Sequence, residues 1–167
     1  MADLITHLCS VLLPASLCSI RWTGPLAVGV VLPDVLGRAP AMAVATFIQE
    51  PGPISGFLLT PFEVFHMPVG ILLSALLVGC FTIRRDRFPM VCGLALGGLI
   101  HVALDVTQFH HNTGYPLLFP FSRVRFEAGI IGSETTVGWS GGLAALTAGA
   151  WWIRWKVRSR IVQIKRN

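Results

Sequence analysis

Two polar side chains lie inside an apolar run near the middle of the sequence, where their types and spacing could do chemistry. His101 and Asp105 stand four residues apart in "GGLIHVALDVTQFHHNTGYPLLFPFS", residues 97–122. Side chains at positions i and i+4 share one face of a helix, so the imidazole and the carboxylate are expected to be neighbours. Imidazole nitrogens and carboxylate oxygens are ligands of zinc and similar divalent ions. The pair therefore predicts one helix's share of a metal site.

Further ionisable residues lie at or within the other apolar segments. Asp3 and His7 open the first segment, Asp34 closes the second, and Glu63 and His66 precede the third. A charge at the centre of a bilayer costs about 2.5–3.5 kcal/mol, so such residues usually face a cavity or a partner. A bound cation would offset the cost of gathering carboxylates in a low-dielectric setting. We expect three histidines and two or more aspartates to bind one divalent ion or two.

Each of these polar residues also has a structural explanation of its own. A single histidine in a membrane helix is often a hydrogen-bonded structural residue. Asp3 can complement the positive end of a helix, and Asp34 can cap the chain that follows it. Glu63 can lie at the membrane interface, and His110 and His111 can lie in a loop. A shared metal site explains why all of these residues occur together. The separate explanations require them to do so by chance.

The composition of the 167 residues indicates a membrane protein. Hydrophobic residues make up 53% of the chain, charged residues only 13%, and the mean hydropathy is +0.68. A soluble domain usually carries about 25% charged residues. The net charge of +5 does not indicate nucleic-acid binding, because the basic residues flank apolar runs and do not form a basic face on a soluble fold.

Five apolar segments predict an all-α fold, namely a polytopic membrane helix bundle with about four to five transmembrane segments. The segments cover residues 4–20, 24–34, 67–83, 88–107 and 137–155. A spanning helix needs about 20 mostly apolar residues, and the last three segments meet that length. The second segment is too short to span alone, and residues 39–48 fit an interfacial or a re-entrant helix. Glycines in the last two segments predict close helix packing.

Basic residues predict how the chain is oriented in the membrane. Arg84, Arg85 and Arg87 form a short turn, and the chain beyond Trp155 is rich in Lys and Arg. Cytoplasmic loops carry an excess of such residues, so both regions are expected in the cytoplasm. We therefore expect a single transmembrane helical domain over residues 1–156 in the cell (inner) membrane, and a basic cytoplasmic tail over residues 157–167. The polar residues then fall at the outer ends of their segments.

Several of these motifs resemble a known family. "DLITHL", "GVVLPDVLG", "FHMPVGILLSALLVG" and residues 97–122 are similar to the YdjM-like membrane-bound metal-dependent hydrolases, also described as LexA-binding, inner-membrane-associated hydrolases. The similarity covers residues 1 to about 125. Its most specific part is the small-residue helix with H-x-x-x-D followed by G-Y-P-L-L-F-P. The resemblance implies that the metal ligands are His7, Asp34, His66, His101 and Asp105.

The chain departs from this family at two motifs. Many members have Asp-x-Asp-His after the second segment, where "PDVLGR" keeps only Asp34. Many also have "HRGxTHS" before the third segment, where only "HMPVG" remains. Fewer ligands weigh against a two-metal site. A fainter likeness of "PD" and H-x-x-x-D to zinc-dependent phospholipase C-like proteins hints at the substrate.

Three functional hypotheses follow. The first is a membrane-bound metal-dependent hydrolase that acts on a lipid-linked or phosphoester substrate with zinc or manganese as cofactor. In it, Glu63 or an aspartate of the ligand set is the general base, and Arg123 and Arg125 hold an anionic oxygen. The two arginines can instead lie beside lipid headgroups. The second hypothesis is ion, proton or metal transport, and the third is a non-catalytic membrane scaffold whose metal ties helices together.

Overall fold

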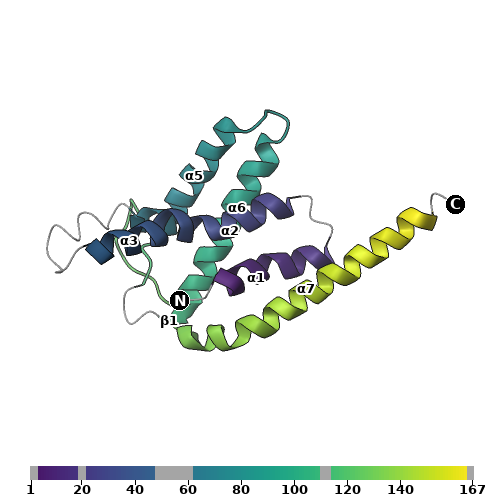
Figure 1. The fold of residues 1–167 in the computed structure, drawn as a ribbon. Coiled ribbons are helices and arrows are strands. Elements are labelled where there is room, and N and C mark those ends of the chain that lie inside the picture. The colour runs from purple at the N-terminus through teal and green to yellow at the C-terminus, as the bar shows by residue number, and fades with distance from the viewer. Residues whose placement is uncertain (1–3, 19–21, 48–61, 110–113, 165–167) are drawn as a thin grey trace.

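The computed structural model describes residues 4–18, 22–47, 62–109 and 114–164, and it is built mostly of helices (Figure 1). The prediction of an all-α fold is confirmed. In chain order the elements are α1 (Leu4–Leu17), α2 (Thr23–Pro33), the π-helix η1 (Asp34–Arg38), α3 (Ala39–Phe47), the 3-10 helix η2 (Val64–His66), α5 (Pro68–Phe81), α6 (Arg87–Thr107), β1 (Gln108–Phe109), β2 (Ile131–Gly132) and α7 (Ser133–Ile164). The two short strands pair in parallel.

The sequence suggested that the second apolar segment stops at Pro33 and Asp34, but in the structure the helix continues past them. The elements α2, η1 and α3 follow one another without a break, and both Pro33 and Ala39 have helical dihedral angles. A proline inside a helix removes one backbone donor, and in this chain a π-helical stretch begins directly after Pro33. Asp34 therefore lies inside a continuous helix, and residues 39–47 extend that helix instead of forming a separate one.

Two helical stretches are long and apolar enough to cross a membrane, Thr23–Val44 and Arg87–Thr107. The apolar helices α1 and α5 have 14 residues each. At about 1.5 Å per residue they reach about 21 Å, which is short of the 30 Å hydrocarbon core of a typical bilayer. The span expected at 67–83 corresponds to α5 and is too short by this measure. The span expected at 137–155 lies within α7, which has 32 residues but is not among the described stretches apolar enough to cross a membrane. Asp34 lies near the middle of Thr23–Val44, not at its outer end.

Helices α2 and α6 pack backbone to backbone. A Cβ atom at Gly97 would lie 2.2 Å from the Leu26 carbonyl oxygen, and one at Gly29 would lie 2.4 Å from the Leu94 carbonyl oxygen. Only glycine permits so close an approach, which confirms the packing predicted for α6. The glycines of α7 do not pack in this way: a Cβ at Gly138, Gly141, Gly142 or Gly149 would meet no atom within 4 Å.

Helix α7 runs alongside α1, the helix that carries His7 (Figure 1). The Trp151 indole donates a hydrogen bond to the Leu12 carbonyl oxygen at 3.0 Å. The Arg154 guanidinium donates to the carbonyl oxygens of Ala15, Ser16 and Cys18. Ala15 and Ser16 lie in the last turn of α1, where carbonyls have no partner within the helix, and Cys18 follows its end. Helix α7 continues to Ile164, so the first residues of the predicted tail are helical.

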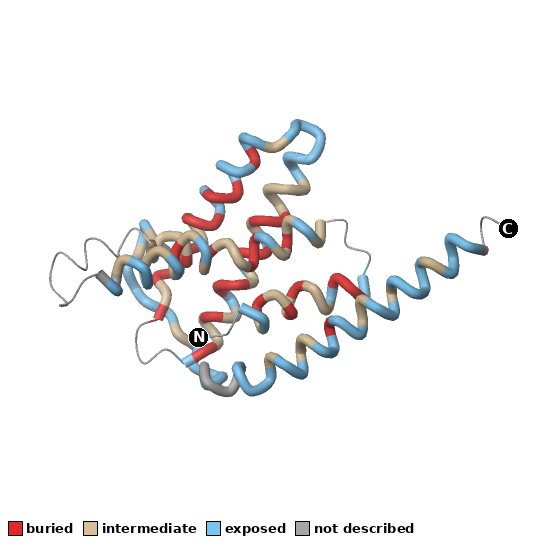
Figure 2. The backbone as a smooth tube through the Cα atoms, viewed as in Figure 1, coloured by how far each residue is buried: buried red, intermediate tan, exposed pale blue. Residues whose placement is uncertain are grey.

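Buried residues are concentrated where α1, α2, α5 and α6 meet, whereas α7 is largely exposed along its length (Figure 2). The apolar core is formed by Val11, Leu26 and Val30, with Leu8, Val31 and Ile100 packed against them. His7, Asp34, His66, His101 and Asp105 lie on α1, η1, η2 and α6.

Candidate metal centre

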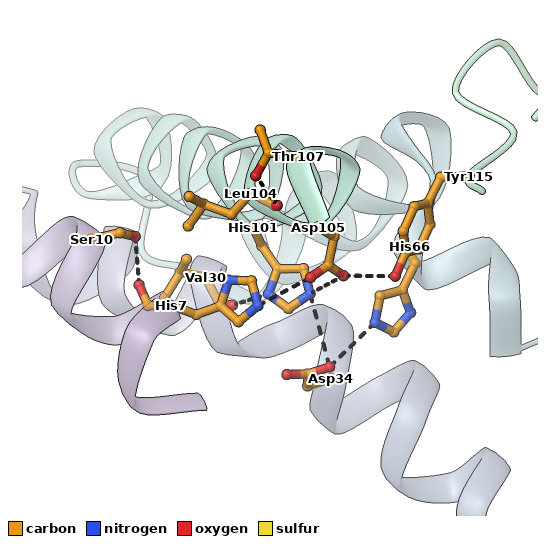
Figure 3. A network of polar contacts seen from close by, with 10 residues as sticks. All are labelled: His7, Ser10, Val30, Asp34, His66, His101, Leu104, Asp105, Thr107 and Tyr115. Carbon is orange, nitrogen blue, oxygen red and sulfur yellow. Dashed lines mark hydrogen bonds and ion pairs between the residues drawn. The ribbon is translucent and has the colours of Figure 1, made fainter. Parts of the chain in front are cut away.

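The structure brings together the five residues expected to be metal ligands (Figure 3). α1 supplies His7, η1 supplies Asp34, η2 supplies His66, and α6 supplies both His101 and Asp105. Their possible ligand atoms form two groups of three, and within each group all three atoms lie within 4.8 Å of one another. We call His7, His101 and Asp105 the inner group, and Asp34, His66 and His101 the outer group.

In the inner group, one carboxylate faces two imidazoles. Asp105 Oδ1 lies 3.2 Å from His7 Nε2, and Asp105 Oδ2 lies 3.4 Å from His101 Nε2. The three side chains are at most 1% exposed. The rings of His7 and His101 stack with their centroids 4.0 Å apart and an angle of 18° between their planes. The i, i+4 spacing on α6 therefore places His101 and Asp105 as neighbours, as predicted.

In the outer group, Asp34 faces the imidazoles of His66 and His101. The Asp34 Oδ1 atom lies 3.3 Å from His66 Nε2 and 3.9 Å from His101 Nε2. The Asp34 side chain is 15% exposed and that of His66 is 9% exposed. Gly37, one turn after Asp34, makes room for His66, because a Cβ at Gly37 would lie 2.7 Å from His66 Nδ1. This group forms the more accessible side of the cluster.

The backbone of α2 fixes the orientation of the His101 ring. His101 Nδ1 lies 2.8 Å from the Val30 carbonyl oxygen, so this nitrogen donates and carries a proton. In the neutral ring, Nε2 then carries the lone pair. It forms no hydrogen bond with any described residue, and neither does Asp105 Oδ1. A lone pair that faces carboxylate oxygens in a buried site is unfavourable unless a proton or a metal ion lies between them.

The charges and the spacing of the cluster both fit a divalent cation. Protonating both His7 and His101 would place two like charges on rings whose centroids are 4.0 Å apart. A divalent ion would instead balance Asp34 and Asp105 while the rings stay neutral. Two ligands about 2.1 Å from a zinc ion at a tetrahedral angle are about 3.4 Å apart. The separations of Asp105 Oδ1 from His7 Nε2, 3.2 Å, and of Asp105 Oδ2 from His101 Nε2, 3.4 Å, are of this size.

Tyr115 belongs to the site, although the sequence did not single it out. Its hydroxyl donates a hydrogen bond to Asp105 Oδ2 at 2.9 Å. Burial and the neighbouring Asp105 carboxylate raise the pKa of Tyr115, so the phenol keeps the proton that it donates. Backbone hydrogen bonds in both directions with Phe126, each 2.8 Å long, hold Tyr115 in place. The only signal in the sequence was its position in "GYPLLFP", the stretch that carries much of the family resemblance.

The structure does not bring Glu63 or Arg123 into contact with the cluster. Glu63 is exposed, and its carboxylate accepts a hydrogen bond from Arg125 Nη2 at 3.2 Å. Arg125 Nη1 also donates to the Gly114 carbonyl oxygen. Arg123 is exposed and forms no ion pair or hydrogen bond with the described part of the chain. The catalytic roles of Glu63 and Arg123 stay predictions.

Three further residues considered as ligands, Asp3, His110 and His111, lie outside the described residues. Comparison of the chain with protein-family models, with curated proteins and with solved structures finds no match. The resemblance to the YdjM-like hydrolases therefore stays a prediction, and the assignment of function depends on the geometry of the centre.

Proposed function

We propose that this chain is a membrane-embedded, metal-dependent hydrolase that acts on a lipid-linked or other phosphoester substrate. The observation that supports this most directly is the buried His101 Nε2, which faces two carboxylates without a hydrogen bond. Catalytic zinc sites commonly combine three protein ligands with an open fourth position. The inner group offers three ligands of the right types, His7, His101 and Asp105.

Zinc suits a set of two imidazoles and one carboxylate, and manganese is the alternative. When bound, a divalent ion supplies a nucleophilic water at neutral pH and polarises the scissile bond. The chain itself orients the ligands. The Val30 carbonyl oxygen fixes the His101 ring, and the Tyr115 hydroxyl holds the Asp105 carboxylate. Such supporting contacts are typical of metal sites and tune their affinity.

Asp34 is the residue best placed to act as the general base. It is the most exposed side chain of the five, and its Oδ1 lies 3.9 Å from His101 Nε2. His66 holds this carboxylate through a 3.3 Å hydrogen bond. A base must lie within reach of the proton that it abstracts, and Asp34 borders the cluster at which that proton would lie. Glu63, the other carboxylate considered for this role, is paired with Arg125.

The membrane arrangement belongs to the same proposal. We propose a multi-pass protein of the cell (inner) membrane with four to five spans, a cytoplasmic C-terminus and a site that opens toward the outer side. The position of Asp34 in the middle of Thr23–Val44 favours a site deeper than the outer edge of the membrane. Arg123 remains the proposed contact for an anionic oxygen of the substrate.

The geometry favours hydrolysis over transport. A transport pathway needs polar groups on both sides of the ion site. On α6, the buried residues that precede His101 are Gly93, Leu94, Gly97 and Gly98, and the glycines among them pack tightly against α2 or α5. On this side of the site, the described residues of α6 therefore offer apolar packing and no buried polar group. A scaffold in which the metal only ties helices together would require a closed shell of four ligands.

The test compares Asp34→Asn with His101→Ala in detergent-purified protein supplied with zinc or manganese. We expect wild type to hydrolyse a phosphodiester, a phosphomonoester or a lipid-linked pyrophosphate. Asp34→Asn should retain metal but lose turnover, whereas His101→Ala should lose both. Asp86→Asn, in the exposed turn before α6, serves as the matched control and should keep turnover near that of wild type. Absence of turnover on all three substrate classes by metal-loaded wild type would contradict the hydrolase proposal.

A further inference from the structure

The inner and outer groups share one atom. His101 belongs to both groups, and its Nδ1 is committed to the Val30 carbonyl oxygen. Only Nε2 is left as a ligand, and one lone pair binds one ion at a time. The two groups therefore cannot each hold an ion through His101 simultaneously.

The two groups also present the same set of donors. Each consists of two imidazoles and one aspartate carboxylate, namely His7, His101 and Asp105 on one side and His66, His101 and Asp34 on the other. An ion in either group would meet ligands of the same types and total charge. The ligand types therefore do not favour one group, and the surroundings of each group decide between them.

The surroundings differ in accessibility and in rigidity. In the outer group, Asp34 is 15% exposed and His66 is 9% exposed, whereas the inner side chains are almost completely buried. Electrostatic attraction between an ion and its ligands is stronger where water is excluded. The inner carboxylate is also fixed by the Tyr115 hydroxyl. Retention therefore favours the inner group, and access favours the outer group.

We propose that the centre binds a single divalent ion, which the outer group captures and the inner group retains. His101 Nε2 serves in both positions, with Asp34 Oδ1 at 3.9 Å on one side and Asp105 Oδ2 at 3.4 Å on the other. His7 and Asp105 take the places of His66 and Asp34 as the ion moves inward. This inference rests on the metal site of the proposed function but not on hydrolysis.

The proposal separates the effects of two histidines. Loss of His66 removes a ligand from the access route only, so binding and release should both slow while the equilibrium affinity changes little. Loss of His7 removes a ligand from the retained position, so the affinity should fall. Supporting contacts of a metal site alone change affinity by about 10- to 100-fold, and loss of a direct ligand should cost at least as much.

The experiment measures Co²⁺ and Zn²⁺ binding by full-length protein in detergent, with His66→Gln and His7→Gln as matched variants. Binding and release rates come from stopped-flow exchange with a chromophoric chelator, and the ligand set comes from the visible absorption spectrum of bound Co²⁺. We expect wild type to bind one equivalent. His66→Gln should keep the wild-type spectrum and affinity while the binding rate and the release rate fall by the same factor. His7→Gln should change the spectrum and weaken binding.

Three results would overturn the inference. Wild type that binds two equivalents would show two occupied groups, and equal changes in spectrum and affinity in the two variants would show one centre with all ligands acting together. Binding of no metal by wild type would remove the site altogether. All readouts are of metal binding, so a protein that behaves as expected here but hydrolyses no phosphoester would contradict only the hydrolase proposal. Melting temperatures confirm that each variant is folded, and His66→Asn and His7→Asn replace a variant that is not.

Discussion

At Gly97 a single added carbon should disturb the metal centre without touching a ligand. It lies one helical turn before His101, on the face of α6 that packs against α2. A Cβ atom there would lie 2.2 Å from the Leu26 carbonyl oxygen and 2.8 Å from the Val30 backbone nitrogen. Restoring a separation of 3.0 Å from the oxygen requires a shift of about 0.8 Å. Both obstructing atoms are backbone, so the helices themselves must move.

A shift of α2 relative to α6 would also move the metal ligands. The Val30 carbonyl oxygen accepts the hydrogen bond from His101, and Asp34 follows Val30 by one turn. Overpacking of this kind costs about 1–3 kcal/mol of folding stability. Metal–ligand distances tolerate deviations of about 0.2 Å, which is much less than the required shift. We therefore expect Gly97→Ala to lower the melting temperature and to weaken zinc binding by about tenfold or more.

Zinc affinity is measured by competition with a chromophoric chelator in detergent, and stability by thermal unfolding of the same sample. Gly141→Ala in α7 is the matched control, because a Cβ at Gly141 would meet no atom within 4 Å. This control should bind zinc and melt as wild type does, or melt slightly higher, because alanine favours a helix. A Gly97→Ala protein with wild-type zinc affinity and melting temperature would refute the conclusion that close packing of α2 on α6 positions the ligands.

Two further substitutions test the contacts that support the centre. Tyr115→Phe removes the hydroxyl that holds Asp105 and should weaken zinc binding by about tenfold with little change in melting temperature; unchanged affinity would exclude this supporting role. Arg154→Met leaves carbonyl oxygens at the end of α1 without their donor and should destabilise the protein by about 1–3 kcal/mol in thermal unfolding. The exposed Arg158→Met is its control. Equal melting temperatures of the two variants would argue against stabilisation of α1 by the hydrogen bonds from α7.

The ligand set could be predicted from the sequence because histidines and aspartates stand out in apolar segments. Histidines and aspartates in apolar segments are costly, and the i, i+4 spacing of His101 and Asp105 holds in any regular helix. The structure places His7, Asp34 and His66 beside this pair, as both the polar pattern and the resemblance suggested.

Other features depend on tertiary structure that no local pattern carries. Proline before an aspartate usually ends a helix, so the continuation of α2 through η1 into α3 was not foreseen. The contact between Tyr115 and Asp105 depends on the path of a loop, and a tyrosine in a loop has no periodicity that points to its partner. The ion pair between Glu63 and Arg125 joins residues far apart in the chain, so the sequence did not predict it.

The central claim is that the five histidines and aspartates bind a metal ion, and elemental analysis tests it most directly. Detergent-purified wild type is compared with a His101→Ala, Asp105→Ala double variant after both have been incubated with divalent ions and freed of excess metal. These two residues include the nitrogen common to both groups and the carboxylate of the inner group. We predict about one equivalent of zinc or manganese in wild type and none in the double variant. Absence of metal from wild type, or the same metal content in both proteins, would contradict the account.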